Sequence, residues 1–121
     1  MSSISEPLAT PLPHRKEIRS WLAPIASRST PLALALALLD LALFCAAMAV
    51  VVLADSILVQ LLAGLAVGVL IARLFILGHD ACHQSLTGHR TLNRWLGRVL
   101  FLPSLTPYSL WEVGHNVVHH G

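Results

Sequence analysis

Two apolar stretches decide the fold of this chain: PLALALALLDLALFCAAMAVVVLA at residues 31–54 and ILVQLLAGLAVGVLIARLFIL at residues 57–77. A helix needs about 20 apolar residues to cross the hydrocarbon core of a bilayer, and each stretch reaches that length. Only Asp55 and Ser56 separate the two stretches, which leaves room for a tight turn and nothing more. The sequence therefore predicts an antiparallel transmembrane helical hairpin.

The composition supports this prediction and excludes several other classes of protein. The chain has 121 residues, of which 55% are hydrophobic and 12% are charged, and its mean hydropathy is +0.71. A soluble domain carries about 25% charged residues, roughly twice as many. The net charge of +2 is too small to indicate nucleic-acid binding. We predict an all-α membrane protein, with cytoplasmic or interfacial helices following the hairpin.

The positions of the basic residues predict the orientation of the hairpin. All eight Lys and Arg residues lie before the spans or at and beyond the end of the second, and only Asp55 lies in the turn. By the positive-inside rule, the N-terminus and everything after the second span face the cytoplasm. Cys45 and Cys82 do not form a disulfide framework, which fits a reducing compartment. We expect a bacterial cytoplasmic membrane rather than the endoplasmic reticulum.

The segments outside the hairpin are expected to lie at the membrane surface. Residues 1–30 are predicted to be flexible or interfacial, with Trp21 at headgroup depth. Residues 90–102 are predicted to form an amphipathic interfacial helix with two faces. The basic face carries Arg90, Arg94 and Arg98, and the apolar face carries Leu92, Trp95, Leu96 and Val99.

A last helix is predicted from about residue 107 to residue 120. Thr106 is its expected N-cap and Pro107 its expected first residue.

Polar and small residues within the spans carry weaker expectations. Asp40 is interpreted as facing the rest of a helix bundle or pairing with a helix elsewhere, because no other polar residue accompanies it. Arg73 is expected to snorkel toward the membrane surface. Gly64 and Gly68 form a small-residue pair that predicts close approach of the first span. The matching surface would consist of Ala42, Ala46 and Ala49.

Five of the seven histidines gather in two clusters just beyond the spans, GHDACH at 78–83 and HNVVHH at 115–120. Imidazole is the commonest metal ligand in proteins. On α-helices, His79 and His83 share one face, and His115 and His119 share another. His120 lies about 100° further round its helix, an arrangement that favours two metal ions over one. The other histidines, His14 and His89, are interpreted as surface residues.

The imidazole donors restrict which metal ions could bind here but do not select one of them. Imidazoles suit iron, copper, zinc or nickel. Asp80 and Glu112 are candidates for accepting a hydrogen bond from the second ring nitrogen of a ligand. Asn116 is a candidate for the same outer role, although it would equally well face water. Cys82 is interpreted as a small filler, and Trp111 either as a wall of the site or as a membrane anchor.

Three motifs resemble the membrane fatty acid desaturases. GHDACHQSL at residues 78–86 looks like their first histidine box, and NRWLG at 93–97 resembles the Asn-Arg-x-x-Gly run that often follows. HNVVHH at 115–120 is similar to their second box. Two boxes at this spacing after a hairpin are a stronger signal than either alone.

The resemblance implies a function. The family holds two iron ions at the cytoplasmic face, reduces dioxygen and introduces a cis double bond into an acyl-lipid or acyl-CoA chain. It receives electrons from ferredoxin or cytochrome b5. Carried over to this chain, the resemblance makes iron ligands of His79, His83, His115, His119 and His120. The expected activity is that of a fatty acid desaturase-type oxidoreductase, whose partners are lipid, dioxygen and the electron donor.

The sequence departs from the family pattern in one respect. A third box, HxxHH, normally follows another pair of spans, and neither is present in this sequence. Five histidines do not complete two iron sites. We therefore interpret residues 31–121 as a truncated desaturase-like domain, the N-terminal part of a desaturase, and expect this chain alone to be inactive.

Three alternatives stay open at this point. A hydroxylase or ketolase of the same superfamily, acting on carotenoids, sphingolipids or alkanes, would carry the same boxes. A non-catalytic two-span protein could bind a metal through them. Haem ligation is disfavoured because these histidines lie outside the spans.

Overall fold

The computed structural model describes residues 13–24 and 27–119, except for the side chains of Asn116 and His119. The described residues form helices and no strand, which confirms the all-α prediction. In chain order the elements are α1 (Arg15–Leu22), α2 (Thr30–Leu53), α3 (Ile57–Cys82), α4 (Arg90–Phe101), a 3-10 turn (Leu102–Ser104), α5 (Tyr108–Val113) and a π-helical segment (Gly114–His119).

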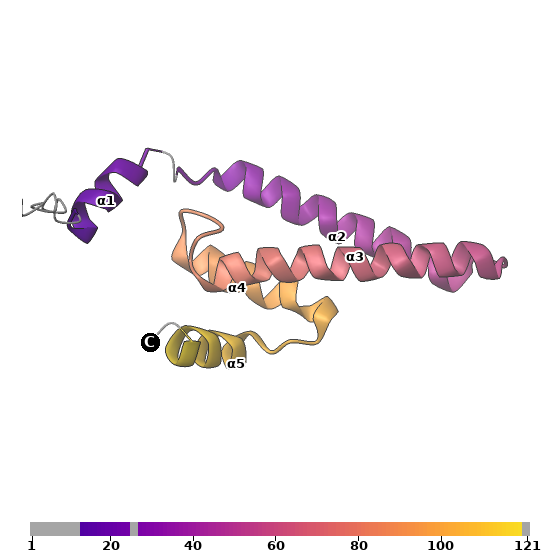
Figure 1. Ribbon diagram of the computed structural model, residues 1–121. Coiled ribbons are helices and arrows are strands. Elements are labelled where there is room, and N and C mark those ends of the chain that lie inside the picture. Colours follow the sequence, from indigo (N-terminus) through magenta and orange to yellow (C-terminus); the bar gives the residue numbers. More distant parts are fainter. Residues whose placement is uncertain (1–12, 25–26, 120–121) are drawn as a thin grey trace, which may run out of the picture.

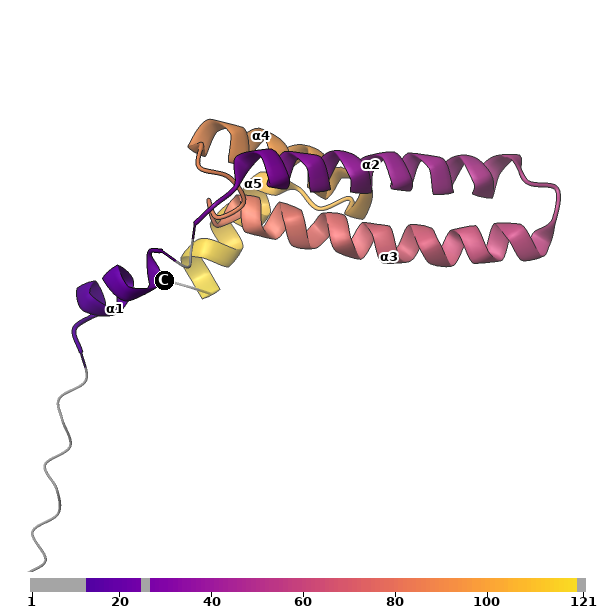
Figure 2. The same cartoon turned by 90° about the horizontal axis from the view of Figure 1, so that it is seen from above.

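Helices α2 and α3 form the predicted hairpin and run side by side in opposite directions (Figure 1 and Figure 2). Ser29 caps α2 by accepting a hydrogen bond from the Leu32 amide (3.4 Å), and the Gln60 side chain donates to the Ala54 carbonyl (2.8 Å) across the turn. Both helices are long and apolar enough to cross a membrane, and only 11% of the most apolar part of each is buried. Such outward-facing apolar surface is expected of helices solvated by lipid.

A charged pair inside the hairpin joins Asp40 to Arg73. Asp40 is 1% exposed and accepts hydrogen bonds from Arg73 Nε (3.1 Å to each carboxylate oxygen) and Nη2 (2.9 Å). Asp40 thus faces the rest of the bundle, as one reading of the sequence expected, but its partner is Arg73 of the same hairpin rather than a helix elsewhere. The antiparallel hairpin brings the two residues opposite each other, although 33 positions separate them in sequence.

The face that α2 turns toward α3 also differs from the expected one. The buried residues of α2 are Ala33, Ala37 and Asp40. A Cβ added at Gly64 or Gly68 would meet no atom within 4 Å, so the expected contact with the alanines of α2 is wrong. The buried charged pair and the packing of Ala37 with Leu74 select a different face of the hairpin.

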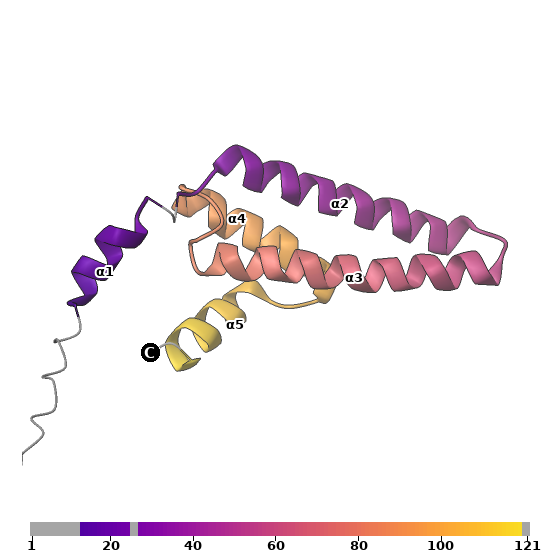
Figure 3. The same cartoon turned by 45° about the horizontal axis from the view of Figure 1, so that its top comes forward.

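Helix α4 returns along α3 in the opposite direction, as Figure 1 and Figure 3 show. Its buried residues are Asn93, Gly97, Leu100 and Phe101, and Leu100 packs with Leu74 and Ala37. Trp95 and Val99, from the predicted apolar face, stay 61% and 41% exposed. The contact with α3 is therefore made by a third face of α4, distinct from the exposed Trp95 and Val99 of the predicted apolar face.

Close approach between α3, α4 and α5 depends on two glycines. A Cβ at Gly78 would lie 2.7 Å from Cδ1 of Phe101, and a Cβ at Gly97 would overlap the Tyr108 ring. Phe101 and Tyr108 thus occupy the space where side chains would otherwise stand. They form a buried cluster with Cys82, flanked by Phe75 and Trp111.

The ends of several elements differ from the expected ends. Helix α3 continues past residue 77 to Cys82 and so includes His79. Helix α5 begins at Tyr108, with Pro107 rather than Thr106 as its N-cap, and residues 114–119 are π-helical. A connection through Leu105, which has a left-handed backbone (φ 55°), sets the direction of α5. Helix α1 ends at Leu22, before Pro24, and has no buried residue.

Candidate metal centre

The first histidine cluster lies at the end of α3. His79 is in the last turn of the helix, and His83 is the C-cap, whose amide donates to the His79 carbonyl (3.1 Å). One helical turn brings the two side chains together, with 3.1 Å between their Nε2 atoms. Gln84 then adopts a left-handed backbone (φ 58°), which stops the helix immediately after the second histidine.

The loop that follows this cluster is held by Asn93, a buried residue of α4. Its Oδ1 accepts hydrogen bonds from the Thr87 amide and the Thr87 hydroxyl (2.8 Å each), and its Nδ2 donates to the Thr87 carbonyl (3.1 Å). Asn93 and Gly97 therefore have separate physical tasks. Asn93 ties the loop to α4, and Gly97 makes room for Tyr108.

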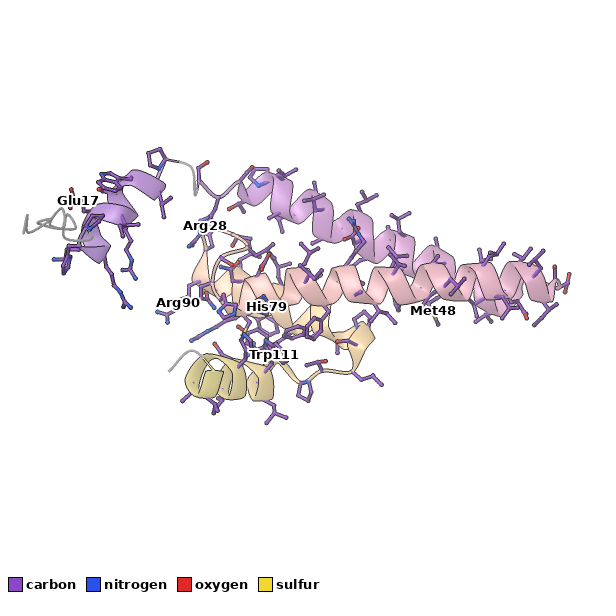
Figure 4. The ribbon with its side chains drawn as sticks, viewed as in Figure 1. Glu17, Arg28, Met48, His79, Arg90 and Trp111 are labelled. Atoms are coloured by element: carbon purple, nitrogen blue, oxygen red, sulfur yellow. The ribbon has the colours of Figure 1, made fainter. Side chains whose placement is uncertain are left out.

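The second histidine cluster reaches the first through aromatic packing. The Trp111 ring of α5 stacks on His115 with 4.6 Å between centroids and 12° between planes, and it meets Phe75 of α3 edge-on (5.2 Å). His115 then lies 5.1 Å, between ring centroids, from both His79 and His83. Figure 4 shows His79 and Trp111 between α3 and α5. The aromatic wall thus positions a histidine that lies 36 residues after His79.

His79, His83 and His115 form a group that can hold a metal ion. One ligand nitrogen from each lies within 4.8 Å of the others. Metal–imidazole bonds are about 2.0–2.1 Å long, so two ligands at right angles on one ion lie about 3 Å apart. The 3.1 Å between His79 and His83 matches that spacing. The two Nε2 atoms would otherwise repel each other unless a proton lay between them.

Neutral nitrogen donors of this kind suit iron, copper, zinc or nickel. The described group supplies three donors, and all three are half-buried. The site can therefore exclude part of the bulk water and still admit a small molecule. Cys82 is not in this group; it is 1% exposed and packs with Phe101 and Tyr108.

Asp80, Glu112 and Asn116 were expected to form hydrogen bonds with the metal ligands, and their positions differ. Asp80 Oδ1 lies 3.4 Å from His79 Nδ1, on the ring nitrogen opposite the one that faces His83. Glu112 interacts electrostatically with Tyr108. His120 and the side chains of Asn116 and His119 lie outside the described part of the chain. The observed π-helical backbone at 114–119 replaces the α-helical spacing that was assumed for His115 and His119.

Tyr108 packs against Phe101 and Gly97 and is buried. It is 6% exposed, and its hydroxyl has no hydrogen-bond partner among the described residues. Burial, together with the nearby carboxylate of Glu112, raises the pKa of Tyr108, while Arg94 and Arg98 oppose that shift. The phenol therefore stays neutral at physiological pH and serves the site as packing.

The sequence motifs identified the histidines but not the aromatic floor that positions them, which consists of the rings of Phe75, Phe101 and Tyr108. Phe75, Phe101 and Tyr108 are separated by up to 33 residues and form no motif of their own. The available signal was the pair of glycines, Gly78 in the first histidine box and Gly97 at the end of the NRWLG run. Both mark places where another segment approaches the backbone.

Comparison with known proteins agrees with this geometry. A family profile described as fatty acid desaturase matches residues 55–121. The sn-1 oleoyl-lipid 12-desaturase of Arthrospira platensis is 38% identical over 52 residues, which are 43% of this chain and 15% of that protein. The sn-1 acyl-lipid omega-3 desaturase (ferredoxin) of Synechocystis sp. is 40% identical over 52 residues, 43% of this chain and 14% of that protein.

A relative from an animal matches a similar share. The omega-3 fatty acid desaturase fat-1 of Caenorhabditis elegans is 37% identical over 46 residues, 38% of this chain and 11% of that protein. No solved structure matches this chain. The profile covers more than half of the chain, including both histidine clusters, and the chain belongs to the fatty acid desaturase family. The matched stretch spans 11–15% of the length of these three relatives.

Proposed function

We propose that this chain contributes part of the di-iron centre of an O2-dependent, membrane-bound acyl-lipid desaturase. The observation that carries the proposal is the triangle of His79, His83 and His115, held at one end of a hairpin that can span a membrane. Membership of the desaturase family supports it. When bound, iron would supply the redox chemistry needed to attack an alkyl C–H bond, which no side-chain acid or base can break.

The proposed ligands are His79, His83, His115, His119 and His120. Asp80 would accept a hydrogen bond from Nδ1 of His79, leaving Nε2 as the donor to the metal. Trp111 would hold the ring plane of His115 by stacking. Glu112 and Asn116 remain proposed hydrogen-bond partners of the ligand histidines. Since five imidazoles are too few for two iron ions, we propose that further ligands lie outside this sequence and that the chain alone is inactive.

The acyl chain is proposed to lie in the groove beside the centre. A groove of about 400 Å³ is lined by Pro107, Leu110, Trp111, Gly114 and His115, and most of that lining is apolar. It opens next to a proposed ligand, so an acyl chain lying in it would pass close to the metal. The names of the relatives support an acyl-lipid substrate.

The proposed partners and location follow from the same family membership. Electrons would come from a ferredoxin or a cytochrome b5 type of donor; one relative carries ferredoxin in its name. The N-terminus and the histidines are proposed to face the cytoplasm, in a bacterial cytoplasmic membrane, because the basic residues flank that end of the hairpin.

Metal binding tests the centre directly. The purified chain should bind Fe²⁺ or its spectroscopic substitute Co²⁺, and alanine at His79, His83 or His115 should each weaken binding at least about tenfold. The matched control is His89→Ala, which removes an exposed imidazole from a neighbouring loop. Equal metal affinity in all four variants would contradict the proposal.

Product analysis tests the reaction. A desaturase that includes this chain, expressed with acyl lipid and an electron donor, should yield a cis-unsaturated acyl product. A hydroxylated product would instead indicate a hydroxylase of the same superfamily. Unsaturated product from the 121-residue chain alone would contradict the proposal that it lacks ligands.

A further inference from the structure

A second site lies at the other side of the first histidine loop, where three segments meet. Arg28, just before α2, and Arg90, the first residue of α4, line one hollow of about 130 Å³. The loop residues Thr87 and Gly88 form another wall. The Gly88 amide donates a hydrogen bond to the Thr30 hydroxyl (3.2 Å), which ties the loop to the start of α2. The hollow is thus built from positions 28, 84, 87–88, 90 and 93.

The two arginines of this hollow have no acidic partner among the described residues. Both side chains are exposed, and no described hydrogen bond or ion pair uses either guanidinium. Thr87 and Asn93 satisfy each other, so they do not compete for the arginines. Two like charges lining one hollow repel each other unless an anion lies between them. The charge arrangement therefore fits a single anionic group of phosphate type.

An apolar groove begins at the same arginine. Arg28 and Ser29 line its mouth, and Leu32, Leu36, Leu77 and Leu86 line its walls, in a volume of about 550 Å³. The groove follows the outer surface of the hairpin, from the first turns of α2 to the end of α3. Asp80 also lines it, but its carboxylate lies against His79 Nδ1. A charged mouth and an apolar body are the two halves of a phospholipid site.

We propose that this chain binds an anionic glycerophospholipid here, with its phosphate between Arg28 and Arg90 and one acyl chain along Leu32, Leu36 and Leu77. Arg28, Arg90 and His79 lie at the same end of the molecule (Figure 4), the end where headgroups would lie if the hairpin spans the membrane. Basic pockets between membrane helices are suited to lipid phosphates. The site is separate from the metal centre and does not depend on iron.

The bound lipid would act as a clamp on the first histidine loop. Arg28 precedes the loop in the chain and Arg90 follows it. Both line the same hollow as Thr87, which lies between His83 and Arg90 in sequence. A phosphate joining the two arginines would add an electrostatic link to the single Gly88–Thr30 hydrogen bond. Lipid binding should therefore raise the thermal stability of the chain.

The test measures lipid affinity of the metal-free chain in mild detergent, by native mass spectrometry and by thermal unfolding. The probes are phosphatidylglycerol, phosphatidylcholine with the same acyl chains, and inorganic phosphate. We expect phosphatidylglycerol to bind most tightly. Because the phosphate would contact both guanidiniums directly, Arg28→Gln or Arg90→Gln should weaken lipid binding about fivefold and the double variant about 30-fold.

Two controls separate this site from general surface charge. Arg15→Gln on α1 and Arg94→Gln, one turn after Arg90, remove the same charge without touching the hollow and should change affinity less than twofold. Leu36→Trp should fill the groove and weaken lipid binding while leaving helicity unchanged. Circular dichroism of every variant checks that loss of binding is not loss of fold.

Three outcomes would overturn the proposal. One is equal binding of phosphatidylcholine and phosphatidylglycerol. Another is an equal loss of affinity in the Arg15, Arg94 and Arg28 variants. The third is stabilisation by inorganic phosphate as large as that by lipid, which would indicate a simple anion site. None of these outcomes depends on metal binding, so a failure here is distinguishable from a failure of the proposed desaturase function.

Discussion

The Asp40 carboxylate accepts three hydrogen bonds from the Arg73 guanidinium, and this ion pair joins α2 to α3 within the apolar hairpin. The Asp40 side chain is 2% exposed and that of Arg73 is 53% exposed. An unpaired charge in a membrane span is costly, so each residue makes the other tolerable. The pair also selects which faces of the two helices meet.

Breaking this pair should destabilise the hairpin, and removing both charges should restore it. We expect Arg73→Met to cost about 2–3 kcal/mol, less than the 3–5 kcal/mol of a fully buried pair because Arg73 is half exposed. Asp40→Leu should cost less, since it leaves the more exposed partner alone. The double variant Asp40→Leu/Arg73→Met should recover most of the loss. Unfolding in mixed detergent micelles measures all three, and additive losses in the double variant would disprove the coupling.

Adding a single methyl group at Gly78 or Gly97 should lower the free energy of unfolding of the chain. Gly78→Ala places a Cβ against Phe101, and Gly97→Ala places one against Tyr108. We expect each to cost about 1–3 kcal/mol by overpacking. Gly68→Ala is the matched control, because its Cβ meets open space and alanine favours a helix by about 1 kcal/mol. The prediction fails if thermal unfolding ranks Gly68→Ala with the other two.

Trp111 should raise the metal affinity of the centre, because its ring stacks on His115 and restricts the rotation of that imidazole. Trp111→Leu removes the stacked ring, so His115 gains rotational freedom and the affinity of the centre for Co²⁺ should fall about 10-fold or more. Trp111→Phe should keep part of the affinity. Trp95→Leu is the control, because Trp95 is 61% exposed and lies on α4 beneath the Arg98 guanidinium (5.0 Å from the ring centroid). An isothermal titration that finds the Trp111 and Trp95 variants alike would refute a positioning role.

The raised pKa of Tyr108 predicts how the stability of the folded chain changes at alkaline pH. Because its folded pKa lies above its ordinary value of 10.0, the unfolded chain loses the phenol proton first as pH rises. Stability should therefore be unaffected by this group below about pH 10 and should decline above it. Tyr108→Phe should remove that decline. It should also leave stability at neutral pH unchanged or slightly higher, because the buried hydroxyl has no described partner.

Thermal unfolding from about pH 8 to about pH 11 measures both effects of the Tyr108 substitution. Other tyrosines cannot mask the result, since the chain contains one. The comparison is the difference between wild type and variant at each pH, so that any other pH-dependent contribution cancels. A variant that retains the full decline would show that another group causes it.

The sequence by itself determined the hairpin and the histidine pairs. Runs of more than 20 apolar residues have one stable form in lipid, a helix, because every backbone polar group must be satisfied internally. His79 and His83 are four residues apart, so local helix geometry alone brought their rings together. Family motifs carried the rest of the functional interpretation.

Only the tertiary structure decided the contacts between distant segments. The Asp40–Arg73 pair, the aromatic floor of Phe101 and Tyr108, and the stacking of Trp111 on His115 join residues from different helices. Apolar periodicity reports which side chains avoid water, but in lipid both the packed and the lipid-facing sides of a helix are apolar. Steric fit at Gly78 and Gly97, and the need to pair buried charge, therefore chose the faces that meet.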